Sequence, residues 1–200
     1  LTRSSAASDV YKRQVHAVRL AIELAGNNKN VTISVLGGGA IGLLAALVFE
    51  AYGYSDIWIA ETNPLRRKML EGIGNMHAYD PRNGAMDEKQ IDIIIDAVGS
   101  GVTRKVASQL IRPGGTIVHI GLQDNEVGLD TRRLTLQEIK FQGTYCYRNS
   151  DFAEALALLS EGKITGRGWV ETRPLDDGAQ SFVDIHEGNA PPKIILQTAL

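Results

Sequence analysis

A glycine-rich stretch carries the residues of this chain that are best suited to chemistry. Gly37, Gly39 and Gly42 fit the pattern G-x-G-x-x-G, between an apolar run typical of a strand and one typical of a helix. The first glycine permits a tight turn, the second lets the backbone approach a pyrophosphate, and the third lets the helix pack closely on a sheet. N–H groups at the start of a helix bind anions. The spacing therefore predicts a phosphate-binding loop.

An acidic residue follows at the distance that a dinucleotide site requires. Glu61 ends a second apolar run, about twenty residues after the last glycine, where a carboxylate can accept hydrogen bonds from ribose hydroxyls. A 2′-phosphate beside this carboxylate would meet like charge, so the sequence favours NAD over NADP. Arg66 and Arg67 follow in the next helix. Arg66 could stack on the adenine or reach the ribose, could attract a 2′-phosphate, or could belong to a solvated helix face.

The ends of two later strands are expected at the same crevice, because ligands bind beyond the carboxyl ends of a parallel sheet. Gly99 and Gly121 lie at these ends and either leave room for a ring or are ordinary strand-to-loop glycines. The residues expected here are Val98, Gly99, Ile120, Gly121 and Leu122.

The elements that position these residues alternate between strand and helix. Strands are expected over 31–36, 56–60, 77–80, 91–97, 116–120 and 139–147, and helices over 15–25, 40–52, 64–72 and 102–111, with a short one around 135. This order predicts right-handed crossovers and an α/β fold, a doubly wound parallel sheet of about six strands. After residue 147 two strand-like runs and two helices, including 151–164, suggest a piece of another domain.

Composition excludes several classes of protein. The formal net charge is −2, so no basic surplus indicates nucleic acid as a partner, and the longest apolar run, 43–49, is too short to span a membrane. Cys146 is the only cysteine, which rules out an intrachain disulfide framework and fits a reducing compartment, so a cytoplasmic location is predicted. No cysteine and histidine residues have the spacing of zinc ligands.

The first fourteen residues, LTRSSAASDVYKRQ, lack the apolar centre and cleavage site of a targeting signal. Their Ser/Ala-rich start resembles translated adapter or vector sequence. Residues 1–14 are therefore expected to be a non-native or disordered leader, with the native domain beginning inside a helix near Val15. The alternative is a flexible native arm.

An ordered series of motifs resembles the medium-chain dehydrogenase/reductase superfamily, in its zinc-dependent alcohol, polyol and diol dehydrogenase branch. The motifs are GGGAIG, IAETNPLRRKML, IDAVGS, PGGTIVHIGL, IKFQGTYCY and DFAEALALLSEGKI. The resemblance covers nearly the whole chain from Val15. It implies an NAD-binding Rossmann domain over 15–147 and a return to the catalytic domain over 148–200.

The resemblance also implies roles for individual residues. Ile41 would pack near the pyrophosphate, Glu61 and Arg66 would hold the adenosine ribose, residues 120–122 would lie along the nicotinamide, and the Tyr145 region would close over the cofactor. The predicted cofactor-binding residues are therefore Gly37, Gly39, Ala40, Ile41, Gly42, Glu61, Arg66, Val98, Gly99, Ile120, Gly121, Leu122 and Tyr145.

Two departures from the family pattern limit this prediction. The GroES-like half, which carries the zinc ligands and the proton relay, is missing, so no catalytic or metal-binding residue is predicted here and zinc is expected only in the full-length parent. Tyr145-Cys146-Tyr147 stands where polyol dehydrogenases of the sorbitol type have F-R-Y. The missing arginine favours the diol and secondary-alcohol members.

The resemblance implies that the parent oxidises a secondary alcohol to a ketone reversibly, with hydride transfer to the nicotinamide. Its substrate would be a small alcohol or ketone, and it would form a homo-oligomer. The 200 residues alone are expected to bind NAD(H) without turnover. An S-adenosylmethionine-dependent methyltransferase, which combines a similar loop and acidic residue, and a non-catalytic nucleotide-binding domain are the alternatives.

Overall fold

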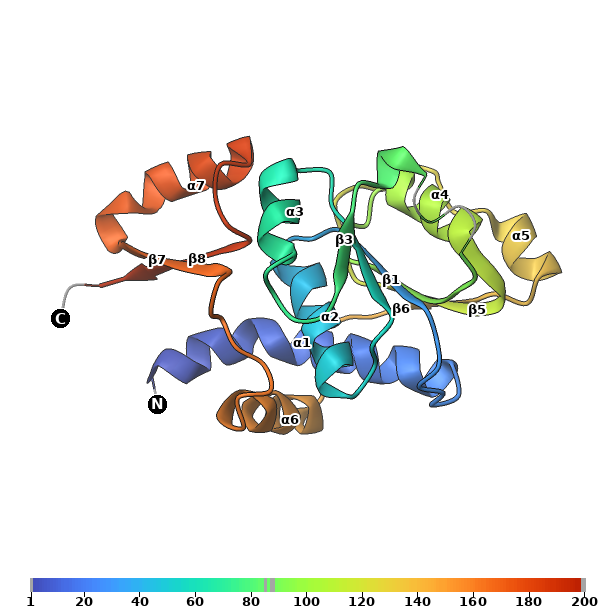
Figure 1. Cartoon of the computed structure of the whole chain (residues 1–200), viewed down its shortest axis with the longest axis horizontal. Coiled ribbons are helices and arrows are strands. Elements are labelled where there is room, and N and C mark those ends of the chain that lie inside the picture. Colours follow the sequence, from blue (N-terminus) through green and yellow to red (C-terminus); the bar gives the residue numbers. More distant parts are fainter. Residues whose placement is uncertain (1, 85, 87–88, 199–200) are drawn as a thin grey trace.

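Six parallel strands form one sheet in the order β3-β2-β1-β4-β5-β6 (Figure 1). The structure, a computed structural model, describes residues 2–84, 86 and 89–198, with the backbone alone for residues 2–10. The strands are β1 (Ile33–Leu36), β2 (Ile57–Ala60), β3 (His77–Tyr79), β4 (Ile91–Asp96), β5 (Ile111–His119) and β6 (Lys140–Gly143). The predicted doubly wound parallel sheet is confirmed, in the strand order typical of dinucleotide-binding folds.

Helices cover both faces of this sheet. One face packs against α1 (Thr2–Leu24), α2 (Ala40–Ala51), α3 (Pro64–Leu70) and α6 (Asn149–Ser160), and the other against α4 (Gly101–Leu110) and α5 (Thr131–Leu136). The strands alternate between the two cores: Ile33 and Val35 of β1 belong to the first, and Leu36 to the second. Burial on both faces explains why Ile93, Ile94 and Ile95 of β4 are apolar in succession.

Local signals set the ends of several elements as the sequence predicts. The Asn63 side chain caps α3 by accepting from the N–H groups of Leu65 and Arg66 at 2.9 and 3.2 Å, and Pro64 occupies the first helical position. Gly26 follows α1 with a φ of +81°. The Asn63 cap, three residues after the end of β2, fixes the start of α3.

Three elements differ from the sequence prediction. Helix α1 begins at Thr2 instead of Val15, and Tyr11 and Gln14, within the predicted leader, are buried. Strand β5 begins at Ile111, which pairs with Ile91, and the intervening residues form an irregularity in the pairing before Thr116 pairs with Ile93. Strand β6 ends at Gly143, which pairs with His119, the last residue of its partner strand β5.

The C-terminal part forms a second, smaller unit, seen at the left of Figure 1. Strands β7 (Val170–Pro174) and β8 (Lys193–Gln197) pair in parallel, and a short 3-10 turn, η2 (Leu175–Asp177), and α7 (Gly178–Glu187) connect them. This unit contacts the first through a Tyr11–Trp169 ring pair and a hydrogen bond from Asn63 Nδ2 to the Gly188 carbonyl oxygen.

Helix α6 lies beside α1 under the sheet (Figure 1). The buried Asp151 carboxylate joins them, since it accepts from Arg19 at 2.8 Å and lies 2.9 Å from Nδ1 of His16. Across the described residues, no helix is both long and apolar enough to pass through a bilayer.

Candidate functional site

The turn between β1 and α2 places its glycines as the sequence predicts. Gly37 has a φ of +99°, and a Cβ there would lie 2.6 Å from Cγ2 of Val98. A Cβ on Gly42 would collide with the carbonyl oxygen of Gly37. A Cβ on Gly39 would instead point into open space, and no side chain caps the start of α2. The helix therefore presents its N-terminal N–H groups beside an open cradle.

Glu61 lies next to this loop at the end of β2, with only 7% of its surface exposed. Its Oε2 accepts the N–H of Gly38 at 3.1 Å, and its Oε1 accepts the N–H of Asn63 at 2.8 Å. The carboxylate thus joins the glycine loop to the segment that begins α3. Each oxygen keeps capacity for a further hydrogen bond.

A cavity of about 760 Å³ lies at the carboxyl ends of β1, β2 and β4. Eight predicted residues line it: Gly37, Gly39, Ala40, Ile41, Gly42, Glu61, Arg66 and Val98. Its apolar lining and its few polar groups match the usual composition of a small-molecule site. The structure therefore brings the glycine loop, the acidic residue and the end of β4 together around one space.

The other five predicted residues do not line this cavity. Gly99 and Gly121 press their backbones together, since a Cβ on either would collide with the loop of the other. Both glycines are required because the loops after β4 and β5 approach each other too closely for a side chain. Gly121 and Leu122 line a separate cavity of about 260 Å³, and Ile120 packs against the core. Tyr145 is 79% exposed.

Residues that the sequence analysis did not select also line the larger cavity. They include Thr62, Pro81, Arg82, Ser100, Val102, Thr103 and Gln123. Pro81 and Arg82 follow β3, whose carboxyl end meets the same edge of the sheet as β2. The rule that selected the ends of β4 and β5 would have found them if it had been applied to β3.

Arginines surround the end of the cavity near Glu61. The Nε of Arg66 is buried and, within the described part of the chain, has no hydrogen-bond partner. Arg67 donates to the Glu61 carbonyl oxygen at 2.6 Å and pairs with Asp80 at 3.2 Å. Hydrogen bonds from Arg82 lower the pKa of Asp80 far below its usual range. The unpartnered Arg66 donor fits a ligand that carries a hydrogen-bond acceptor.

Asp96 positions the loop after β4 and was also missed. It is fully buried, and its Oδ1 accepts the N–H groups of Val98 and Gly99 at 3.1 and 2.8 Å. Its Oδ2 accepts from the Thr103 hydroxyl at 3.0 Å. An acidic residue at the end of an apolar strand was the available sequence signal, because a buried carboxylate requires hydrogen-bond partners.

The described residues do not form a metal site. Among them, no three histidine, cysteine, aspartate or glutamate side chains lie close enough to hold a metal ion together. The zinc implied by the family resemblance therefore does not fit the donor groups of the described residues.

Comparison with known proteins relates this arrangement to dehydrogenases. The sequence model of the zinc-binding dehydrogenases matches residues 40–161. A probable diacetyl reductase [(R)-acetoin forming] of Saccharomyces cerevisiae is 30% identical over 200 residues, which cover 90% of this chain and 47% of that protein. The chain spans about half the length of the curated relatives that it matches. The methyltransferase alternative is not supported.

Solved structures share the fold. Acetophenone reductase from Geotrichum candidum, in complex with NAD, has a TM-score of 0.81 at 21% identity, over 94% of this chain and 53% of that one. A dehydrogenase from Sinorhizobium meliloti, bound to NADP, has a TM-score of 0.72 at 22% identity, over 85% and 53%. Both nicotinamide cofactors therefore occur in proteins of this fold.

Proposed function

This chain belongs to the zinc-binding dehydrogenase family, and on that premise we propose that its larger cavity binds NAD(H) for hydride transfer. One observation carries the proposal: the open cradle at Gly39 and the buried carboxylate of Glu61 lie on the same 760 Å³ cavity. The cradle suits a pyrophosphate at the start of α2, and the carboxylate suits ribose hydroxyls.

Different residues of this site would bind different parts of the cofactor. The N–H groups at the start of α2 would hold the pyrophosphate, because Gly39 has no side chain to block its approach. Glu61 would accept the ribose hydroxyls while Gly38 and Asn63 keep its carboxylate in place. The unpartnered Nε of Arg66 would donate to the same end of the cofactor.

The position of Glu61 supports NAD rather than NADP as the preferred cofactor. A 2′-phosphate would place its negative charge beside the Glu61 carboxylate, which is buried and held by two N–H groups. This repulsion would weaken the binding of NADP. Arg66 lines the same cavity, and its positive charge would reduce this repulsion but not cancel it.

We propose that the parent protein interconverts a small secondary alcohol or diol and its ketone, as the name of the yeast relative suggests. The nicotinamide supplies the hydride acceptor or donor when it is bound. What the described residues do is bind and orient the cofactor. We propose that the 200-residue chain on its own binds NAD(H) without turnover.

We also propose a domain assignment, an oligomeric state and a cellular location. Residues 148–200 would belong to the catalytic domain, which the separate β7–β8 sheet supports. A homo-oligomer would form through open surfaces such as β6, whose four residues are all exposed. A cytoplasmic location rests on the single, unpaired cysteine Cys146.

Fluorescence titration of the purified chain with NADH and with NADPH tests the proposed function. We expect saturable binding of both, with the dissociation constant for NADH roughly tenfold lower. A tenfold preference for NADPH would contradict the assignment of Glu61, and binding of neither would contradict the proposed function itself.

A further inference from the structure

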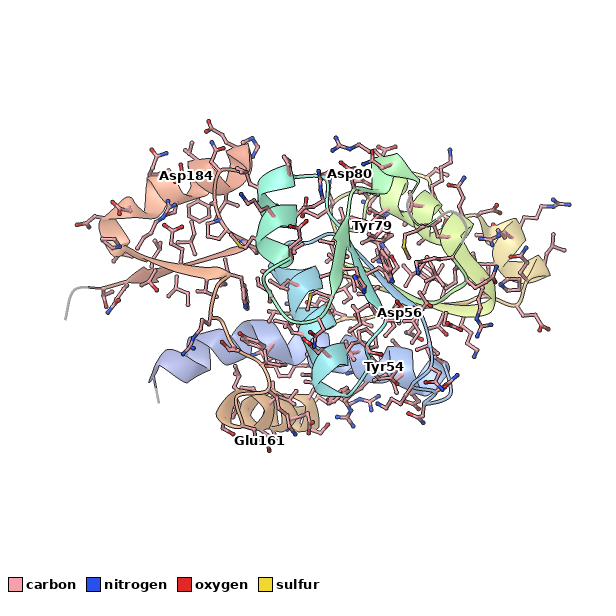
Figure 2. All side chains as sticks on the ribbon, in the orientation of Figure 1. Tyr54, Asp56, Tyr79, Asp80, Glu161 and Asp184 are labelled. Atoms are coloured by element: carbon pink, nitrogen blue, oxygen red, sulfur yellow. The ribbon has the colours of Figure 1, made fainter. Side chains whose placement is uncertain are left out.

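Arg82 occupies a fixed position at the rim of the cavity. The short turn η1 (Pro81–Asn83) follows β3 and brings Arg82 beside the residue that follows Glu61. Its Nε donates to Asp80 Oδ1 at 2.8 Å, and its Nη2 donates to Asp80 Oδ2 at 2.5 Å and to the Thr62 carbonyl oxygen at 3.0 Å. Figure 2 shows Asp80 next to Tyr79, at the end of β3. The guanidinium is thus held along one edge.

This arrangement leaves specific parts of the guanidinium available. The Nε and Nη2 donors are used within the protein, whereas Nη1 forms no hydrogen bond with any residue that the structure describes, and the side chain of Arg82 is 64% exposed. Asp80 accepts from it at two points and also pairs with Arg67 at 3.2 Å, so two guanidinium groups share this carboxylate. The pair fixes the plane of the Arg82 guanidinium, and an exposed flat face of this kind suits stacking on a ring.

Apolar side chains line the same space as Arg82. Pro81, Val98 and Val102 all line the cavity, and Val102, in the first turn of α4, is 73% exposed. A planar heteroaromatic ring would cover this apolar surface. Because Arg82 contacts Thr62, directly after the proposed ribose carboxylate, the adenine ring is the part of the cofactor that would lie here.

We propose that Arg82 is a further cofactor-binding residue whose guanidinium stacks on the adenine ring. Asp80 is a positioning residue, which fixes the plane of that guanidinium through the two-point pair. This inference rests on the proposed function, and it names an adenine contact that does not depend on the 2′ position of the ribose.

Titrations of the 200-residue chain with 5′-AMP and with NADH test this assignment. In Arg82→Ala we expect affinity for both ligands to fall by the same factor, roughly three- to tenfold, because both carry the adenine. Arg82→Lys should lose as much, since an ammonium group keeps the charge but has no flat face. Arg132→Ala, an exposed arginine on α5, is the matched control and should bind like the wild type.

Asp80→Asn tests the positioning role. It should weaken 5′-AMP binding in the wild-type background and have no further effect in Arg82→Ala, whereas a general structural effect would weaken binding in both. Wild-type affinity in Arg82→Ala or in Arg82→Lys would overturn the inference and leave the proposed function intact. Failure of the wild type to bind NADH and 5′-AMP would overturn both.

Discussion

The N–H of Gly38 donates to Oε2 of Glu61 at 3.1 Å, so the carboxylate at the end of β2 holds the loop that follows β1. The other oxygen accepts from Asn63 at 2.8 Å. Glu61 therefore positions the loop before any ligand binds, and it lines the cavity at the same time. One residue links the geometry of the proposed pyrophosphate site to that of the proposed ribose site.

Glu61→Gln tests both roles of this carboxylate, its support of the loop and its contact with the cofactor. The amide keeps the size of the side chain but accepts through one oxygen, so Gly38 or Asn63 loses its acceptor. We expect the free energy of unfolding to fall by about 1–2 kcal/mol and NADH affinity to fall roughly tenfold. NADPH affinity should fall less, because the like charge is gone.

Chemical denaturation and titration with both cofactors measure these effects. Glu71→Gln, at an exposed glutamate in the same region, is the control and should change neither quantity. An NADH-to-NADPH affinity ratio that stays unchanged in Glu61→Gln would show that this carboxylate does not select the cofactor.

Gly42→Ala tests the packing of α2 against the loop. Its Cβ would meet the carbonyl oxygen of Gly37, a backbone atom that cannot turn away, so we expect the chain to lose about 1–3 kcal/mol of stability. Gly143→Ala, whose Cβ meets nothing within 4 Å, should leave thermal stability nearly unchanged. Equal melting temperatures for the two variants would contradict this account of the loop.

The sequence predicted the parts of the site that depend on local structure. Gly37, Gly39, Gly42 and Glu61 could be placed because a strand, a turn and a helix follow one another within a short stretch. Arg82 could not be placed, because its position depends on how η1 leaves β3 and on contacts with Asp80 and Thr62.

The differences between the predicted and the observed helix and strand bounds also arise from contacts between distant parts of the chain. The sequence placed the start of α1 at Val15, because what makes Tyr11 part of the core is its contact with Trp169, far along the chain. The prediction for β6 was too long, since no sequence pattern indicated that its pairing with β5 stops at Gly143, opposite His119.

Tyr11→Ala tests whether residues 11–14 belong to the folded unit. Tyr11 is buried and packs against Trp169 with ring centroids 6.4 Å apart, so its truncation should cost about 3–5 kcal/mol. Arg13→Ala, two residues away and exposed, should have little effect. If both variants unfold at the wild-type denaturant concentration, residues 11–14 do not contribute to the core.

The same tyrosine predicts a loss of stability at high pH. Burial raises the pKa of Tyr11 to about 12, above the value of about 10 in an unfolded chain. Its contribution is therefore complete below pH 10 and is lost as the pH rises toward 12. Melting temperatures between these limits should fall less steeply in Tyr11→Phe than in the wild type, and parallel curves would contradict the assignment.

Titration of the wild type, Gly39→Ala and Gly143→Ala with NADH tests the central claim most directly. Both alanines would enter open space and both should fold, but only the methyl group at position 39 lies at the cradle beside α2. We predict that Gly39→Ala loses roughly tenfold in NADH affinity while its melting temperature is unchanged, and that Gly143→Ala binds like the wild type. Equal NADH affinity in all three proteins would contradict a pyrophosphate site at this loop.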